Sequence, residues 1–214
     1  IHDVIPDFHN TRVRFANFVR TLDKDALNRA AECKNEIDFV FKREKLCGKL
    51  VDMLNSGEMK SRVTHNDTKL NNVLLDEKTG KAVAVIDLDT VMKGSTCYDF
   101  GDSVRFGCST ALEDEEDLSK VHFSLPLFEV YSRGFLGALE GALTDTEVKN
   151  MSLGSVMMTL ECGMRFLTDY LDGDNYFKIS KDKHNLIRCR TQFRLVEEME
   201  RDYDKMLAIV DKYA

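Results

Sequence analysis

Helix-breaking residues are scarce in this chain. Its 214 residues include only two prolines, Pro6 and Pro126, and 12 glycines, so few positions interrupt a helix. Apolar residues recur at helical spacing within residues 15–22, 46–54, 148–166 and 186–210. With 43% hydrophobic residues, a chain of this length can bury one sizeable core. We therefore expect one mainly helical domain.

The last two predicted helices lie in the C-terminal part of the chain, and the first of them has recognisable end signals. Thr144 followed by Glu147 forms a capping box, which predicts a helix that starts there and runs along the apolar stripe to Phe166, with Gly173 beyond its end. We expect a final helix from about Leu186 that carries apolar residues as far as Val210 on one face.

Two short apolar runs predict strands. Residues 73–75 and 83–86 are separated by residues 76–80, in which Gly80 can adopt the positive φ of a hairpin loop. The fold class is therefore predicted as α+β, mainly helical, with a small β-hairpin.

Charge and cysteine content exclude several classes of function. A net charge of -7 argues against nucleic-acid binding, which needs a basic surface. The six cysteines form no C-x-x-C pair, so we expect reduced, mostly buried thiols and no zinc or redox site. The acidic residues 113–117 are expected to form a solvated loop or the start of a helix. Without a long apolar run or a signal sequence, a cytoplasmic location is predicted and no membrane partner is expected.

Residues 63–73 contain the pattern H-x-D-x-x-x-x-N, formed by His65, Asp67 and Asn72 and followed directly by a predicted strand. This pattern matches a kinase catalytic loop. Phosphoryl transfer needs a carboxylate to orient the acceptor hydroxyl and oxygen ligands for Mg²⁺. Asp67 is the predicted base, Asn72 the predicted Mg²⁺ ligand with Asn71 as its alternative, and His65 the residue that braces the loop.

The predicted hairpin returns Asp87 to the side of this loop. Asp87 ends the second strand, where kinases carry a metal-binding Asp, and Asp89 is a possible second ligand. Residues 99–101 spell Asp-Phe-Gly, the metal-binding motif of protein kinases, but they follow no predicted strand and we assign them no metal. Lys69 either reaches the transferred phosphate or is an exposed loop lysine.

At these residues the sequence resembles the aminoglycoside phosphotransferase and choline kinase superfamily, in which the metal-binding Asp lies in an I-D-x-x segment such as residues 86–89. Residues 64–76, 86–92, 165–171, 176–177 and 184–192 are similar to the N-acetylhexosamine 1-kinase family. One departure is Lys93, which stands where that family is expected to have proline.

The resemblance implies an ATP-dependent enzyme of carbohydrate metabolism that phosphorylates the anomeric hydroxyl of N-acetylglucosamine or N-acetylgalactosamine. Asp67 would be the base, Asn72 and Asp87 would bind Mg²⁺, and Arg165 and Tyr176 would contact the sugar. An arginine would repel a polycationic aminoglycoside or the ammonium group of choline. The alternatives for these two residues are a surface ion pair for Arg165 and a half-buried packing role for Tyr176.

The superfamily has two lobes, and no Gly-rich loop or strand-borne lysine precedes the catalytic loop here. We therefore expect residues 1–214 to form a protein-kinase-like C-terminal lobe, inactive without the nucleotide-binding lobe of the full-length protein. Alternative functions are a choline, aminoglycoside or other small-alcohol kinase, and an inactive kinase-fold binding module. The presence of Asp67, Asn72 and Asp87 argues against the last of these.

Overall fold

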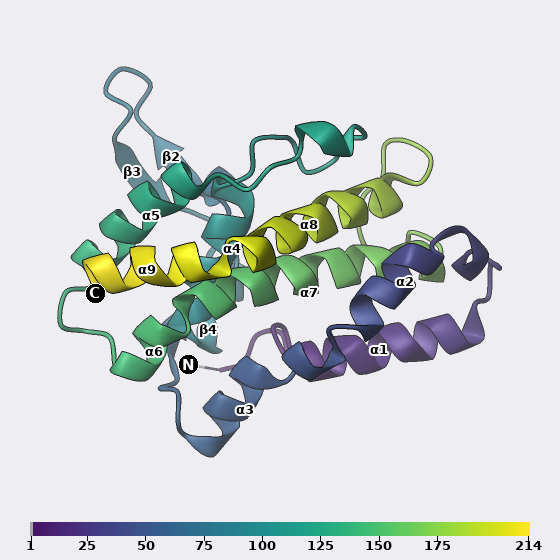
Figure 1. Cartoon of the computed structure of the whole chain (residues 1–214), viewed down its shortest axis with the longest axis horizontal. Helices are drawn as coiled ribbons and strands as arrows, with labels where there is room; N and C mark the ends of the chain where they lie inside the picture. The colour runs from purple at the N-terminus through teal and green to yellow at the C-terminus, as the bar shows by residue number, and fades with distance from the viewer. Residues whose placement is uncertain (1) are drawn as a thin grey trace.

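The computed structural model describes residues 2–214 and shows a mainly helical α+β fold (Figure 1). The helices are α1 (Thr11–Lys24), α2 (Lys34–Phe41), α3 (Lys49–Ser56), α4 (Thr96–Gly107), α5 (Leu125–Ala138), α6 (Asp145–Lys149), α7 (Met151–Asp172), α8 (His184–Arg201) and α9 (Tyr203–Tyr213). The strands are β1 (Arg62–Thr64), β2 (Val73–Leu75), β3 (Ala82–Val85) and β4 (Met92–Gly94). The predicted fold class is confirmed.

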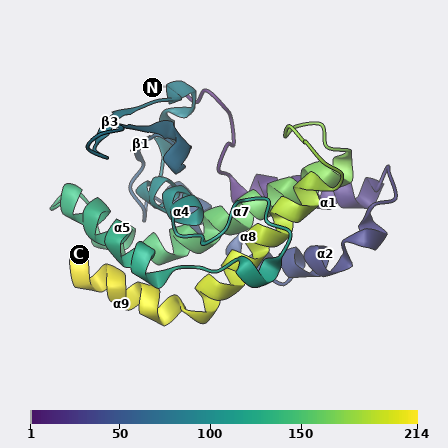
Figure 2. The same ribbon diagram turned by 90° about the horizontal axis from the view of Figure 1, so that it is seen from above.

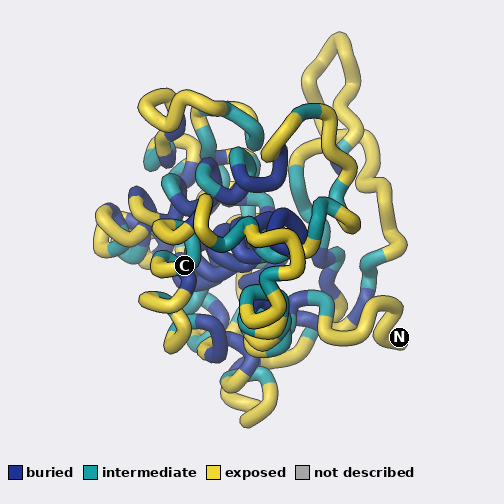
Figure 3. The backbone as a smooth tube through the Cα atoms, turned by 90° about the vertical axis from the view of Figure 1, so that its right-hand side faces the viewer, coloured by how far each residue is buried: buried dark blue, intermediate teal, exposed yellow. Residues whose placement is uncertain are grey.

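Helix α7 forms the centre of the core. It contacts α1, α4 and α8, and Figure 3 shows buried positions gathered inside a shell of exposed ones. Apolar residues occur on all sides of α7, as expected for a helix that is surrounded by other helices. Met151, Leu160, Met164 and Leu167 on α7 have no exposed surface. Helix α7 is therefore the buried central element of the fold.

Helices α4 and α7 approach closely at two glycines. A Cβ atom on Gly101 of α4 would collide with the backbone of Gly154 on α7, and one on Gly154 would collide with Cys97. Phe100, which has no exposed surface, packs edge-on against Phe128 with ring centroids 5.8 Å apart. Phe100 and Gly101 of the Asp-Phe-Gly segment therefore have packing roles within a helix.

Two helix predictions were partly wrong. The capping box at Thr144 and Glu147 is confirmed, but it starts the short helix α6, which ends at Lys149, and α7 begins at Met151. The final predicted helix is divided into α8 and α9 at Asp202, whose φ of -99° and ψ of 14° depart from helical values. In both cases a short polar side chain binds nearby: Asn150 donates to the Thr146 carbonyl, and Asp202 pairs with Lys205. A bond from a short side chain to the backbone, as at Asn150, competes with a continuous helix.

The predicted hairpin is confirmed: β2 pairs with β3 in antiparallel register, and Gly80 has a φ of 66°. The sequence analysis missed the second small sheet, in which β1 pairs with β4. Both sheets lie on one side of the helical body (Figure 2). Because β1 leads into the catalytic loop and β4 follows Asp87, this pairing joins the two segments that carry the predicted site.

The remaining sequence predictions have mixed outcomes. All six cysteines are free thiols, and all but the partly buried Cys162 are buried. Within residues 2–214, no helix combines the length and the apolar character needed to cross a membrane. Residues 113–117 form a loop, as predicted, but Glu113 is not simply solvated, because it pairs with buried Arg105 at 2.9 Å.

Candidate active site

The catalytic loop lies between β1 and β2, and Asp67 and Asn72 contact each other within it. The side-chain Nδ2 of Asn72 donates to the backbone oxygen of Asp67 at 2.8 Å and to its Oδ2 at 3.0 Å. The Nζ atom of Lys69 lies 3.5 Å from the same Oδ2. The Asp67 carboxylate is therefore oriented by one amide and faces one cation, while part of its surface stays exposed.

His65 connects the loop to the strand end before Asp87. Its Nε2 lies 2.9 Å from the carbonyl oxygen of Ile86, and its Nδ1 accepts from the backbone N–H of Asp67 at 3.3 Å. Since a carbonyl only accepts, Nε2 carries the hydrogen. Thr90 adds a third link by donating its hydroxyl to the His65 carbonyl at 2.7 Å. The ring contacts fit the bracing role predicted for His65.

Asp87 has a backbone conformation that is uncommon for a residue other than glycine, with φ 62° and ψ 53°. Such conformations persist where surrounding contacts enforce them, and they cluster at functional sites. Here the preceding N–H, of Ile86, donates to the Asn72 carbonyl at 2.9 Å, so the metal candidates Asp87 and Asn72 lie on neighbouring segments. Asp89 follows in a short 3₁₀ turn and is exposed.

The donor set fits a nucleotide-bound magnesium ion. Asn72 uses its Nδ2 toward Asp67, which leaves its amide oxygen for a cation, and Asp87 and Asp89 supply carboxylates. Within residues 2–214, no group of three or more His, Cys, Asp or Glu side chains gathers into a metal site. Mg²⁺ is commonly held by one or two carboxylates together with the substrate phosphates.

Asp99 supports the catalytic loop from α4. Its two carboxylate oxygens accept the backbone N–H groups of His65 at 2.9 Å and of Asn66 at 2.7 Å. Burial raises the pKa of Asp99, while these two backbone hydrogen bonds lower it. Both oxygens are thus used by the loop, and the Asp of the Asp-Phe-Gly segment acts as a positioning residue. Sequence reasoning noticed this residue but missed its role.

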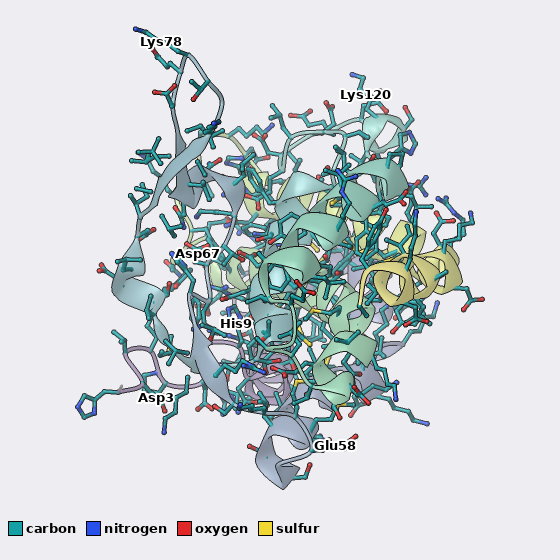
Figure 4. The ribbon with its side chains drawn as sticks, turned by 90° about the vertical axis from the view of Figure 1, so that its left-hand side faces the viewer. Asp3, His9, Glu58, Asp67, Lys78 and Lys120 are labelled. Atoms are coloured by element: carbon teal, nitrogen blue, oxygen red, sulfur yellow. The ribbon has the colours of Figure 1, made fainter. Side chains whose placement is uncertain are left out.

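A cavity of about 480 Å³ opens beside Asp67. Its walls include Lys69 from the loop, His9 from the segment before α1, Arg165 from α7, and Tyr176 from the loop after α7. Figure 4 labels Asp67 and His9, both of which line this cavity. The cavity therefore brings Asp67 together with both residues predicted to contact a substrate.

Arg165 stacks on aromatic rings instead of forming an ion pair. Its guanidinium carbon lies 5.3 Å from the ring centre of Phe8, 5.8 Å from that of Tyr176 and 5.4 Å from that of Phe177. None of the ion pairs formed by residues 2–214 includes Arg165, so the alternative of a surface ion pair was wrong. Tyr176 is 71% exposed, which also contradicts the half-buried packing alternative.

Asp169 fixes the loop that carries Tyr176. Its carboxylate accepts backbone N–H groups from Asn175 at 2.9 Å, Tyr176 at 2.8 Å and Phe177 at 2.9 Å. The side chain of Asn185 donates to it as well, at 2.9 Å. Sequence reasoning missed Asp169, because its partners are recognisable only when the loop's conformation is known.

Positive charge exceeds negative charge around the cavity. The lining carboxylates are Asp67, Asp102, Glu113 and Glu161, and the lining Lys and Arg residues are Lys69, Arg105, Arg165, Lys178 and Arg188. Arg105 pairs with Asp102 at 2.8 Å and with Glu113 at 2.9 Å. Within residues 2–214, Arg165 and Lys178 have no carboxylate partner, so the cavity suits a neutral or anionic molecule better than a cation.

The chain matches a protein-family model. The model described as "Phosphotransferase enzyme family" (APH) matches residues 1–131. The match includes the catalytic loop with Asp67 and Asn72, as well as Asp87. It ends within α5, so Arg165 and Tyr176 lie outside it.

Proposed function

Because the chain belongs to the phosphotransferase enzyme family, we propose that it carries the catalytic loop of an ATP-dependent kinase whose acceptor is the anomeric hydroxyl of an N-acetylhexosamine. The family implies phosphoryl transfer to a small molecule. The observation that carries the proposal is the position of Asp67, which is oriented by Asn72 and lines the same cavity as Arg165 and Tyr176.

In the proposed reaction, Asp67 accepts a hydrogen bond from the acceptor hydroxyl and takes its proton as the oxygen attacks the γ-phosphorus. A new oxygen–phosphorus bond forms, the bond between the γ-phosphorus and the bridging oxygen breaks, and ADP leaves. Lys69 is close enough to Asp67 to donate to the transferred phosphoryl group. Mg²⁺ held by Asn72 and Asp87, with Asp89 as a further ligand, would supply charge neutralisation at the phosphates.

The charges of the cavity support a neutral sugar over a cationic acceptor. Arg165 can donate to sugar hydroxyls or to the acetamido carbonyl, and exposed Tyr176 can stack on the sugar ring. A choline or aminoglycoside acceptor would bring positive charge close to Arg165 and Lys178. Those acceptors are therefore the less favoured alternatives within the same chemistry.

Exposed apolar side chains on the hairpin support a second lobe. Leu74, Val83 and Val85 on the hairpin are exposed, as is Leu88 in the turn after it, and the hairpin projects from the helical body (Figure 1). An exposed apolar cluster of this kind marks a binding surface. We propose that the nucleotide-binding lobe of the same full-length protein, together with ATP, covers this face.

A substrate panel on the full-length enzyme tests the function. ADP formation is measured with ATP and Mg²⁺ against N-acetylglucosamine, N-acetylgalactosamine, choline and kanamycin, and phosphorus NMR locates the new phosphate. The proposal predicts turnover with an N-acetylhexosamine and a phosphate on its anomeric oxygen. Turnover with choline or kanamycin alone would contradict the sugar acceptor, and no metal-dependent turnover with any acceptor would favour the inactive binding module.

A further inference from the structure

His9 bridges the central helix and the catalytic loop. It lies just before α1 and is 8% exposed. Its Nδ1 is 2.8 Å from Oε1 of Glu161 on α7, and its Nε2 is 2.8 Å from the backbone oxygen of Asn66. Asn66 immediately precedes Asp67, so this backbone oxygen belongs to the peptide unit that leads into the predicted base.

Both ring nitrogens of His9 face oxygen atoms, and with Glu161 ionised both of these oxygens only accept. The Asn66 carbonyl only accepts, and an ionised Glu161 only accepts. An imidazole with one N–H would direct a lone pair at one of these oxygens, whichever tautomer formed. With an ionised Glu161, these two contacts therefore select the imidazolium form of His9.

Every polar group of Asn66 has a hydrogen-bond partner. Asp99 accepts its N–H, His9 binds its carbonyl, its Oδ1 accepts from Thr64 at 2.9 Å, and its Nδ2 donates to the Thr90 carbonyl at 3.0 Å. Its φ of 66° is uncommon for a residue other than glycine. The direction in which the next side chain, Asp67, leaves the backbone depends on this enforced conformation.

We propose that protonated His9, paired with Glu161, is a positioning residue that holds the Asn66–Asp67 peptide so that the Asp67 carboxylate faces the acceptor. The inference rests on the proposed role of Asp67 as the base. It adds a requirement for one proton on a residue that does not touch the reacting atoms.

The surroundings of His9 set the direction of its titration. Burial alone lowers the pKa of His9, but the Glu161 carboxylate raises it, and the net pKa lies above the ordinary value of 6.5. The other charged or titratable groups nearby are Arg165 on α7, which lowers this pKa, and Tyr98 and Asp99 on α4. Positioning is therefore complete at low pH and is lost as the pH rises through the His9 pKa.

Removal of the pair in two steps separates positioning from stability. His9→Ala leaves Glu161 as a buried, unpaired charge, because its second oxygen has no partner within residues 2–214. His9→Ala with Glu161→Gln removes that charge as well, so the free energy of unfolding should recover. We expect kcat in the full-length enzyme to fall about 10- to 100-fold in both variants, to lose its alkaline decrease in both, and not to recover in the double variant.

The matched control is His122→Ala. His122 also pairs with a buried glutamate, Glu198, at 3.1 Å, but outside the cavity. This variant should keep the wild-type kcat and pH profile. In addition, nitrogen NMR of the wild-type protein should show hydrogens on both His9 ring nitrogens below pH 6.5.

Three outcomes would overturn the inference. If the double variant recovers kcat together with stability, the pair is only structural, and a singly protonated ring below pH 6.5 would exclude the imidazolium. A wild-type enzyme that phosphorylates no hydroxyl acceptor would overturn the proposed function and this inference together. The first two results would contradict the role of His9 but leave the proposed function intact. Failure of the inference can therefore be distinguished from failure of the proposed function.

Discussion

Asn72 holds Asp67 through one side-chain nitrogen, which donates to the Asp67 backbone oxygen at 2.8 Å and to its Oδ2 at 3.0 Å. Within residues 2–214 no hydrogen-bond donor reaches the side-chain oxygen of Asn72, which leaves that oxygen for a cation. A single buried side chain thus connects the orientation of the predicted base with the predicted metal site.

Asn72→Ala is expected to affect both the orientation of Asp67 and the binding of Mg²⁺. Without the amide, Asp67 loses its orienting donor and Mg²⁺ loses one ligand, so kcat should fall at least about 10-fold and the Mg²⁺ concentration for half-maximal activity should rise. Steady-state kinetics across a magnesium titration measures both effects. Asn71→Ala tests the alternative assignment. If exposed Asn71 gives the larger loss, Asn72 is not the ligand.

Asp99→Asn should weaken the catalytic loop. The amide nitrogen would face one of the two N–H groups of His65 and Asn66 that the carboxylate now accepts. We expect the free energy of unfolding to fall by about 1 to 3 kcal/mol and kcat to decrease. Urea denaturation and kinetics check the two effects against Asp211→Asn, an exposed position on α9. Unchanged kcat would show that the support from α4 does not reach Asp67.

Asp169→Asn is expected to act on acceptor binding. Its carboxylate organises the backbone of residues 175–177, and loss of one accepting oxygen should loosen the loop that carries Tyr176. The KM for the acceptor should rise about 10-fold with a smaller change in kcat, and amide exchange of residues 175–177 should accelerate. Asp172→Asn, exposed on the same helix, is the control. A loss confined to kcat would contradict this role.

The free energy of unfolding is expected to fall in acid as Glu147 becomes protonated. Burial alone raises its pKa, but hydrogen bonds from Arg62, Thr144 and Thr96 lower it from 4.5 to about 2. Because the folded-state pKa is depressed, the stabilisation is present above pH 4.5 and is lost as the pH falls toward 2. Glu147→Gln should remove on the order of 3 kcal/mol at neutral pH.

Urea denaturation at pH 7 and pH 3 measures this effect, with exposed Glu140→Gln as control. The difference between wild type and Glu147→Gln should shrink at the lower pH. A difference that is equal at both pH values would mean that the Glu147 charge does not contribute.

The parts of the site that sequence alone predicted are local. Asp67 and Asn72 lie five residues apart, and the hairpin that returns the chain to Asp87 is encoded by two short apolar runs and Gly80. The family match confirms the phosphotransferase assignment over residues 1–131. The catalytic, metal and sugar roles of individual residues remain predictions.

The parts that sequence missed depend on distant contacts. His9 reaches Asn66 across 57 positions and Glu161 across 152, and no local pattern marks such partners. The Asp-Phe-Gly segment resembles a metal-binding motif in sequence, but its role depends on its place in α4. There Asp99 accepts hydrogen bonds from the catalytic loop, and Phe100 and Gly101 pack in the core. The helix breaks at Asn150 and Asp202 were missed because the apolar spacing continues through both of them.

The central claim is that Asp67 is the base for phosphoryl transfer, and Asp67→Asn tests it most directly. In the full-length enzyme, kcat with ATP and an N-acetylhexosamine is measured beside the Kd for ATP. We predict that kcat falls by about 10²- to 10⁴-fold while the Kd for ATP stays nearly unchanged. A variant that retains wild-type turnover would contradict the assignment of Asp67 and the account built on it.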